Sequence, residues 1–376
     1  MDIAIPRETR AHENRVLLTP SGVKTLIHHG HRVFVETGAG AGAGHPDADY
    51  QSAGAVIAFS RMEVFGRGAL VAGVYAPEPR DYGLLQAGQT VIAFWALPAA
   101  RPEDIAALLE RQITAVGIEV LEDDKGQAPV LQSMSEIAGS LAVIVGAGLL
   151  LNEFGGKGIL IGGAPGVPPA HFVILGGGVL GCSAARAAQG VGADVTILDR
   201  SVDRLRSAVE RVGRGVTTML ATRPNIEKAL SFADLVLGAV AVHGERAPVL
   251  VTRDMLALMK PRSVVMDLSI DMGGCFETSR PTAFPHATYD VDGILHFCVP
   301  NLPSVAARSA TLALNNVLLP YVVSVAEHGF ERALGVMPEL RRGTYLHRGQ
   351  CTRESLARAF GLPFTPLLGA ASGTGE

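Results

Sequence analysis

The stretch VVMDLSIDMGGCFE, residues 264 to 277, places two aspartates in an apolar run that ends at a glycine pair. An ionised carboxylate loses on the order of several kcal/mol when it is buried without a partner. Asp267 and Asp271 therefore each need a cation, a hydrogen-bond donor or water. The stretch alone leaves open which partner each aspartate has and what chemistry it serves.

A glycine motif supplies the second chemical pattern. Gly176-x-Gly178-x-x-Gly181 follows a predicted strand and opens an alanine-rich helix, and a second predicted strand ends at Asp199. The glycines allow a tight turn and the close approach of a pyrophosphate, while the helix N-terminus offers unpaired N–H groups to the anion. Together these elements predict a dinucleotide site in which Asp199 binds the ribose hydroxyls.

The carboxylate of Asp199 also bears on which dinucleotide binds. A negative charge at this position repels a 2′-phosphate, which predicts NAD as the cofactor. Arg200 and Arg204 are close in sequence and could offset that repulsion. NADP is therefore disfavoured but stays open.

Two series of short apolar runs must position these residues. Alternation with helical segments predicts a first series of strands at 2–6, 32–37, 69–75, 91–97 and 114–120. After the proline- and glycine-rich stretch at 162–170, a second series is predicted at 172–175, 194–198, 234–240 and 263–270. From about residue 305 the pattern is helical, and the last eight residues, GAASGTGE, are predicted to be disordered. The alternation predicts an α/β fold.

Composition limits the class of partner. The 376 residues are 48% hydrophobic and 18% charged, which fits two domains with buried parallel strands. The net charge of −4 gives no basic surface for nucleic acid or an anionic membrane, so a small-molecule partner is expected. The apolar stretch at 137–151 is too short to span a bilayer and is predicted to be a buried helix. Four cysteines without a CxxC pair favour a reducing, cytoplasmic location.

Several long motifs resemble one family. IPRETRAHENRVLLTPSGV, MSEIAGSLA, GVPPAHFVILGGGVLG and MDLSIDMGGCFETSRPT resemble the alanine dehydrogenase and pyridine nucleotide transhydrogenase α-subunit family, in its order and over nearly the full length. The resemblance implies two Rossmann-like domains, with long helices between them and the active site in the cleft. An NAD-binding domain at 130–306 would be inserted into a discontinuous catalytic domain at 1–129 and 307–376. It also implies a homo-oligomer, such as a hexamer.

The resemblance also implies roles for single residues. Arg15 would bind the substrate carboxylate, and Asp271 would face the nicotinamide and the reacting amine or imine. Asp267, within the strand, is instead expected to be a structural carboxylate held by backbone donors. Three further positions match residues near the cofactor, although a loop or capping role is an alternative for each: Ser135, Arg204 and Asn301.

Two positions match residues associated with a metal in some family members. These are Glu13 and His328. Two isolated ligands do not define a metal site, because a protein-bound metal normally has three or four protein ligands. No metal is predicted.

Two positions depart from the family pattern. The family's lysine, which contacts the substrate's carboxylate and carbonyl, falls at Tyr75, and its catalytic histidine falls at Ala96. Flanking residues such as Pro77 and Phe94 stay in register, so the alignment is sound. A positioned general acid or base contributes roughly 10²- to 10⁴-fold to a rate, so losing both groups is expected nearly to abolish amino-acid deamination.

These departures shape the predicted function. The intact cofactor motif predicts an NAD(H)-dependent oxidoreductase that transfers hydride to or from an imine, amine or carbonyl substrate other than alanine. Tyr75 is predicted to be a catalytic residue that donates a proton or stacks on a ring. Two alternatives stay open: an L-alanine dehydrogenase with rearranged catalytic groups, and an NAD-binding protein without catalysis.

Overall fold

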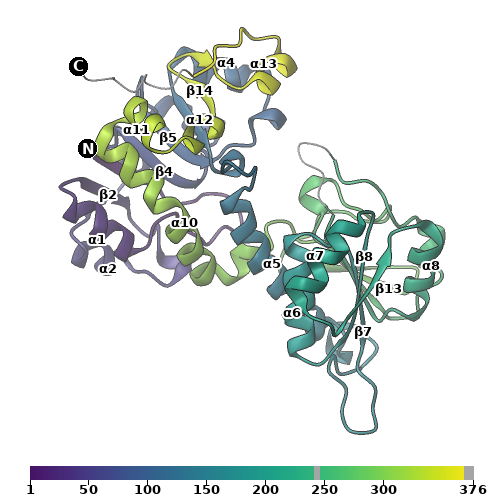
Figure 1. The fold of residues 1–376 in the computed structure, drawn as a ribbon. Helices are drawn as coiled ribbons and strands as arrows, with labels where there is room; N and C mark the ends of the chain where they lie inside the picture. The colour runs from purple at the N-terminus through teal and green to yellow at the C-terminus, as the bar shows by residue number, and fades with distance from the viewer. Residues whose placement is uncertain (241–245, 368–376) are drawn as a thin grey trace. The chain divides into compact units, whose positions relative to one another are not determined.

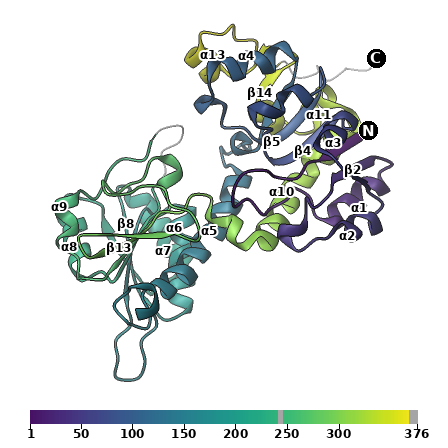
Figure 2. The same ribbon diagram turned by 180° about the vertical axis from the view of Figure 1, so that it is seen from behind.

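The computed structural model describes residues 1–240 and 246–367, and these divide into two compact units (Figures 1 and 2). Unit 1 comprises Met1–Met134 and Ser304–Glu376, and unit 2 comprises Ser135–Pro303. The sequence-based domain limits at 129/130 and 306/307 stay a prediction. The predicted disorder of the last eight residues falls on positions outside the described part of the chain.

Unit 1 is built on an eight-stranded sheet in the order β15-β14-β6-β5-β4-β1-β2-β3. The first six strands of the chain pair in parallel, and β14 and β15 form an antiparallel hairpin added at the β6 edge. The bounds are β1 Asp2–Ile5, β2 Arg32–Glu36, β3 Val56–Ala58, β4 Leu70–Tyr75, β5 Thr90–Phe94, β6 Thr114–Gly117, β14 Thr344–His347 and β15 Gln350–Cys351.

Helices cover the sheet of unit 1. The first of them starts after Thr19, whose hydroxyl accepts the Gly22 N–H, with Pro20 at the first helical position. The longest helix carries buried Leu314, Leu318 and Val322 into the core. The bounds are α1 Pro20–His28, α2 Asp47–Ser52, α3 Arg61–Arg67, α4 Pro102–Glu110, α10 Ala307–His328, α11 Phe330–Val336, α12 Glu339–Gly343 and α13 Glu354–Phe360.

Unit 2 has a seven-stranded sheet in the order β12-β13-β11-β10-β7-β8-β9. Helices α6 and α7 lie on one face and α8 on the other in both views (Figures 1 and 2). The strands are β7 His171–Leu175, β8 Asp194–Asp199, β9 Val216–Leu220, β10 Leu235–Gly238, β11 Val264–Asp267, β12 Thr288–Val291 and β13 Ile294–Phe297. The helices are α6 Val179–Gly190, α7 Val202–Val212, α8 Arg223–Phe232 and α9 Arg253–Leu256.

The two sheets share one topology. In unit 1 the parallel strands run 3-2-1-4-5-6 in chain order, and in unit 2 the sequence β9-β8-β7-β10-β11-β13 repeats that order. The order reverses between β1 and β4 in one unit and between β7 and β10 in the other. Ligands of open α/β sheets bind at such a reversal, at the carboxyl ends of the strands. The predicted fold class, two Rossmann-like α/β domains, is confirmed.

Two described helices, Pro129–Leu149 (α5) and Leu302–His328, are long and apolar enough to cross a membrane by length and composition alone. Both instead supply side chains to a hydrophobic core. The prediction of a buried helix at 137–151 holds for one face of α5 only. Gly139 and Gly146 let that face lie directly on α6 and on strands β10 and β11 of the same unit, whereas Ile144, on the opposite face, is 69% exposed.

Two predicted strands are shorter than the sequence suggests. The strand predicted at 91–97 ends at Phe94, because Ala96 has a φ of 49°, which is incompatible with extended backbone. The strand predicted at 263–270 ends at Asp267, and a single 3₁₀ turn, Ile270–Met272, carries Asp271 beyond it. Both changes place the functional candidates in loops at the carboxyl ends of strands.

Candidate nucleotide and substrate sites

The glycine motif of unit 2 forms the turn between β7 and α6. Gly176 has a φ of 113°, and a Cβ there would lie 2.4 Å from the Ala239 carbonyl oxygen. A Cβ on Gly181 would lie 1.9 Å from the Gly176 carbonyl oxygen, so only glycine allows this helix to pack on the turn. Gly178 is the N-cap of α6, no side chain caps it, and the space beside it is open.

Asp199 ends the neighbouring strand and faces the same turn. Its carboxylate accepts the Gly177 N–H at 2.8 Å and the Ser201 N–H at 2.9 Å, and it is 5% exposed. Each ionised oxygen can accept more than one hydrogen bond, so capacity for ribose hydroxyls is left. The Arg204 side chain, 57% exposed, lies 4.0 Å from this carboxylate. An open helix N-terminus beside a held carboxylate fits a dinucleotide.

The two aspartates of the opening stretch have different surroundings. Asp267 is fully buried; it accepts the backbone N–H groups of Ser269, Cys275 and Phe276, and the hydroxyl of Ser279 at 2.6 Å. Its predicted structural role is therefore confirmed. Asp271 is exposed at the carboxyl end of β11, where its Oδ2 lies 3.4 Å from the backbone N–H of Asn301.

The other two positions matched to the cofactor lie in unit 2. Asn301 has a φ of 52°, a left-handed conformation that asparagine adopts more readily than most residues. Its backbone contact with Asp271 brings these two site candidates together. Ser135 is half-buried on α5.

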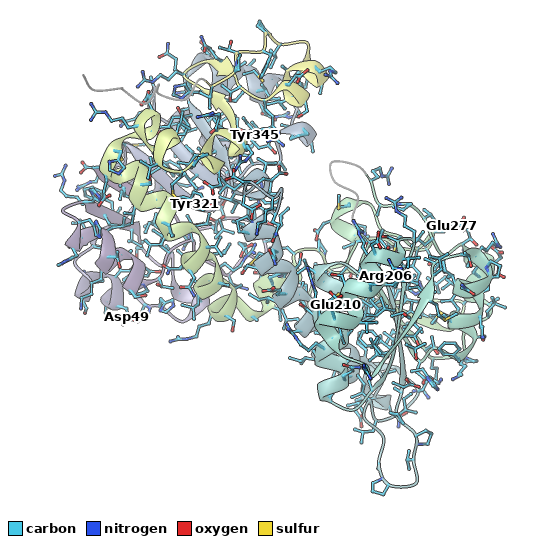
Figure 3. The ribbon with its side chains drawn as sticks, in the orientation of Figure 1. Asp49, Arg206, Glu210, Glu277, Tyr321 and Tyr345 are labelled. Atoms are coloured by element: carbon cyan, nitrogen blue, oxygen red, sulfur yellow. The ribbon has the colours of Figure 1, made fainter. Side chains whose placement is uncertain are left out.

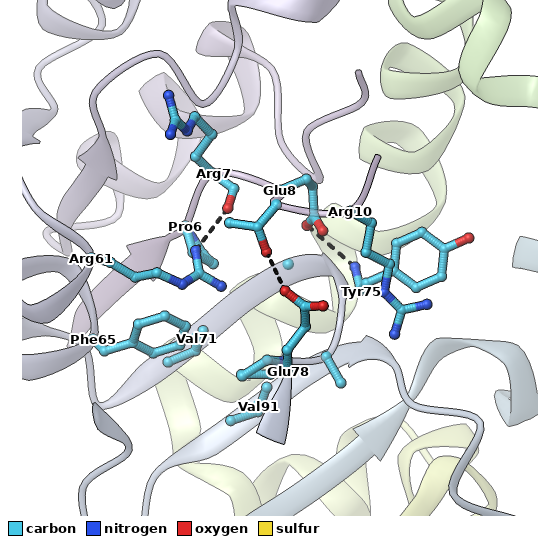
Figure 4. Close-up of a pocket in the computed structure, with 14 residues that line it drawn as sticks. Pro6, Arg7, Glu8, Arg10, Arg61, Phe65, Val71, Tyr75, Glu78 and Val91 are labelled. Atoms are coloured by element: carbon cyan, nitrogen blue, oxygen red, sulfur yellow. Dashed lines mark hydrogen bonds between the residues drawn. The ribbon is translucent and has the colours of Figure 1, made fainter. Parts of the chain in front are cut away.

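The substrate candidates of unit 1 gather at the reversal of its sheet. Strand β1 pairs with β4 only through Ile3–Leu70 and Ala4–Val71, and beyond this point the two strands separate. A small cavity of about 10 Å³, room for one water molecule, lies here among Glu8, Arg10, Tyr75 and Glu78, which follow these strands (Figure 4).

Glu8 holds the end of β4. The ladder between β4 and β5 has one extra residue on β4 between Ala72 and Tyr75. The carboxyl of Glu8 accepts the N–H groups that this bulge involves, from Val74 at 2.7 Å and from Tyr75 at 3.2 Å. Figure 4 shows the bond from Tyr75. Burial raises the pKa of this carboxyl to about 7, although the backbone donors oppose the shift.

Arg15 is held by its neighbour Glu13. The guanidinium donates from Nε at 2.8 Å and from Nη2 at 2.6 Å to the two oxygens of Glu13, and it donates from Nη1 to the Met134 sulfur at 3.4 Å. Burial acts to lower the pKa of Arg15, but the Glu13 carboxylate outweighs it and the pKa is raised. The site therefore contains a fixed cation whose charge is already balanced.

Tyr75 stands at the centre of this cluster. Its ring packs edge-on against Phe94, with the ring centroids 5.5 Å apart. The guanidinium carbon of Arg10 lies 4.0 Å from the ring centroid, and that of Arg15 lies 5.9 Å from it. The position matched to the family's lysine therefore presents an aromatic ring with two guanidinium groups near it.

Ala96 lies just after β5, the strand next to β4. Glu119 accepts the N–H of Ala96 at 2.8 Å and that of Trp95 at 3.2 Å, and Tyr345 donates its hydroxyl to the same carboxyl at 3.1 Å. Burial raises the pKa of Glu119. Tyr345, labelled in Figure 3, is itself buried, so this network fixes the loop that carries Ala96.

The sequence-based predictions do not name several residues of these networks, among them Glu8, Arg10 and Glu119. Glu8 and Arg10 lie within four residues of the end of the strand predicted at 2–6. Charged residues at the end of a predicted strand could have indicated a functional role. Glu119 falls within the run predicted as a strand at 114–120, and a carboxylate in an apolar run was its signal. Neither signal names a partner.

The two positions that match metal-associated residues of the family, Glu13 and His328, contact other side chains in this structure. Glu13 bonds to Arg15, and His328 Nε2 lies 3.8 Å from the carboxylate of Glu327. Cys275 is fully buried, and burial raises its pKa well above the usual value, as expected of a small side chain packed in the core.

The chain matches two family models in succession. Residues 4–138 match the alanine dehydrogenase/PNT N-terminal domain, and residues 142–354 match the alanine dehydrogenase/PNT C-terminal domain. Alanine dehydrogenase of Halomonas elongata is 43% identical over 97% of this chain and 98% of its own length. Alanine dehydrogenase of Mycobacterium tuberculosis is 42% identical with the same two coverages.

Solved structures give the same relationship. An L-alanine dehydrogenase superposes with a TM-score of 0.92 at 41% identity, covering 96% of this chain and 99% of its own. A transhydrogenase from Sinorhizobium meliloti gives a TM-score of 0.80 at 27% identity, covering 94% of this chain and all of its own. These findings confirm the resemblance drawn from the motifs. The chain belongs to the alanine dehydrogenase/PNT family of oxidoreductases.

Proposed function

We propose that the protein transfers hydride between NAD(H) and a carbon–nitrogen or carbonyl substrate other than alanine. The observation that carries this proposal is the site of unit 1, in which Arg15 is kept while an uncharged ring, Tyr75, and a methyl group, Ala96, stand where the family has its lysine and histidine. The residues proposed to bind the cofactor and the substrate carboxylate are therefore present. The lysine and histidine with which the family acts on alanine are replaced.

The nucleotide is assigned to unit 2. Gly176, Gly178 and Gly181 would face its pyrophosphate at the α6 N-terminus, and Asp199 would accept from its ribose hydroxyls. When bound, NAD supplies the hydride acceptor, or NADH the donor. Further contacts are proposed for three residues matched to the cofactor: Ser135, Arg204 and Asn301.

The substrate side of the reaction is assigned to three residues. Arg15 binds a carboxylate, for which its Nη1 and Nη2 groups keep N–H donors beyond those given to Glu13. Tyr75 donates a proton to the reacting group or stacks on it, and Asp271 balances positive charge on the amine or imine. A preformed imine needs less proton transfer than the hydrolysis of an amino acid, which suits a site without the histidine.

Domain roles, location and assembly complete the proposal. Residues 130–306 form the NAD-binding domain, and residues 1–129 with 307–376 form the catalytic domain. The four cysteines are free and buried, as expected of a protein in the reducing cytoplasm. We also propose that the chain forms a homo-oligomer.

L-Alanine dehydrogenase is the second candidate function, and the comparisons favour it. Relatives that share 40–43% of their residues over 97% of the chain carry that name. In this alternative, Tyr75 and the nearby guanidinium groups would have to replace the proton chemistry of the lysine and histidine. A binding protein without catalysis is the third candidate, and turnover of any substrate would eliminate it.

Turnover of L-alanine decides between the first two candidates. We expect the wild type to show negligible NADH formation from L-alanine, and negligible NADH consumption with pyruvate and ammonia, at 340 nm. The double variant Tyr75→Lys, Ala96→His should gain measurable activity, because both groups are needed together. Robust turnover of alanine by the wild type would refute the first candidate and establish the second.

The backbone at residue 96 supports the design of this variant. Ala96 has a φ of 49°, and histidine occupies that left-handed region more often than most residues. Glu119 holds the N–H of residue 96 whatever side chain is present. Adding Asp271→Asn to the double variant should abolish the gained activity, whereas Asp203→Asn, at an exposed position of α7, should leave it unchanged.

A further inference from the structure

Arg10 is a cation held in place by an aromatic ring. Its guanidinium carbon lies 4.0 Å from the Tyr75 ring centroid, within cation–π distance, and Figure 4 shows the guanidinium group beside that ring. Tyr75 is itself fixed, because Glu8 holds its backbone N–H and Phe94 packs against its ring. The ring therefore positions the guanidinium group of a residue that lines the small cavity.

The charge of Arg10 is less balanced than that of its neighbours. Arg15 has a bidentate partner in Glu13, and Arg61 pairs with Asp81. The backbone carbonyl oxygen of Arg10 accepts the Glu13 N–H at 3.2 Å, but within the described part of the chain its guanidinium group has no salt bridge and no hydrogen bond. Glu78 interacts with it electrostatically, but the Glu78 carboxylate accepts from Thr9 and Arg80.

An arginine in this state suits a carboxylate ligand. Its planar group presents up to five N–H donors, and it can pair with both oxygens of a carboxylate. Arg15, 5.9 Å from the same ring, is already assigned one carboxylate of the substrate. Two guanidinium groups against one ring thus offer two anionic subsites. The Glu8 carboxyl opposes these cations only in part near neutral pH, since burial raises its pKa to about 7 and it is then about half ionised.

We propose that Arg10, stacked on Tyr75, binds a second carboxylate of the substrate and makes the site selective for dicarboxylic 2-oxo or 2-amino acids. This inference rests on the proposed function, in which Arg15 binds the first carboxylate. It also gives Tyr75 a specific task, because a lysine at position 75 would place a like charge beside Arg10. Arg10 thereby supplies the positive charge that the family's lysine supplies at position 75.

Calorimetric titration of the full-length protein tests the proposal without requiring turnover. The probes are two matched pairs that differ in a terminal carboxylate against a methyl group: 2-oxoglutarate with 2-oxopentanoate, and 2-oxoadipate with 2-oxohexanoate. We expect the dicarboxylate of at least one pair to bind about 10-fold or more tightly than its partner, the effect of a charge-assisted hydrogen bond. Arg10→Gln should remove that preference, and Arg10→Lys should restore part of it.

Arg80→Gln is the matched control. It removes the same charge from an exposed arginine nearby that already pairs with Glu78, and it should keep the preference. Equal binding of both members in both pairs, no detectable binding, or a preference that survives Arg10→Gln would overturn the proposal. Failure of the proposed function has a different signature, namely selective binding of dicarboxylates that depends on Arg10 but no NAD-linked turnover of them.

Discussion

At the scale of single residues, substitution by asparagine should affect different properties at two neighbouring aspartates. It should lower stability at Asp267 and turnover at Asp271. Asp267→Asn leaves four buried donors, at Ser269, Cys275, Phe276 and Ser279, without a full set of acceptors. We expect a loss of about 1–3 kcal/mol in stability, measured as a lower Tm by scanning fluorimetry. Asp271→Asn, at an exposed position, should leave the Tm within about 1 °C and act on turnover only.

The carboxyl of Glu8 should make stability depend on pH. Its pKa is about 7 in the folded protein against 4.5 for the unperturbed group, so folding favours the protonated form. The associated stability is complete below pH 4.5 and is lost as the pH rises through 7. The loss is on the order of 3 kcal/mol.

Comparison of the wild type with Glu8→Gln isolates this effect. Glutamine keeps the acceptor for Val74 and Tyr75 but does not ionise. The Tm of the wild type should therefore fall relative to that of Glu8→Gln between pH 5 and pH 8. Glu110→Gln, at an exposed position, is the control and should follow the wild type throughout. Parallel curves for the wild type and Glu8→Gln would contradict the assigned pKa.

At the scale of elements, helix α6 offers a test of the nucleotide turn. Gly181→Ala would place a Cβ 1.9 Å from the Gly176 carbonyl oxygen, so α6 must move away from β7. We expect a loss of about 3 kcal/mol or more, together with the loss of NADH binding in a fluorescence titration. Gly190→Ala lies in the same helix with nothing within 4 Å, and it should be neutral or stabilise by about 0.5–1 kcal/mol. Tight NADH binding by Gly181→Ala would contradict the assignment of the turn.

The elements also show what the sequence could predict. Strands β7 and β11 and the glycine turn were predictable, because buried parallel strands give unbroken apolar runs and the fingerprint has fixed spacing. The short edge strands β3 and β9 and the hairpins β12–β13 and β14–β15 were missed. Strand β9, for instance, has the sequence VTTML and no fully buried residue, so two threonines interrupt the unbroken apolar run that marks a buried strand.

The substrate site was predictable only in part, for a related reason. The motif identified Arg15 and Tyr75, but the roles of Glu8 and Arg10 arise from contacts with Tyr75 across more than sixty residues of sequence. No periodicity within either segment encodes such a contact. The same holds for Glu119, which reaches back to the N–H of Ala96. The sequence therefore shows that a charged residue lies in or near a strand, but only the tertiary structure shows which residue it contacts.

At the scale of the whole molecule, apolar side chains at the surface indicate further association. Helix α5 is apolar, yet only 33% of its most apolar 18-residue segment is buried. Ile144, on its open face, is 69% exposed. Phe154, in the segment after that helix, is 58% exposed. Burying such side chains is favourable by about 25 cal/mol per Å², which is why exposed apolar patches usually mark interfaces.

We therefore predict a homo-oligomer, such as a hexamer, in which a second copy of the chain covers α5. Multi-angle light scattering should give a mass that is a multiple of 39.3 kDa. Ile144→Glu should shift the mass towards that of the monomer, because the interface would have to bury a charge. The Tm of this variant should stay close to that of the dissociated wild type. Val202→Glu, at an exposed position in the first turn of α7, is the control and should leave the mass unchanged. A monomeric wild type at micromolar concentration would refute the assembly, and an intact oligomer of Ile144→Glu would move the interface away from α5.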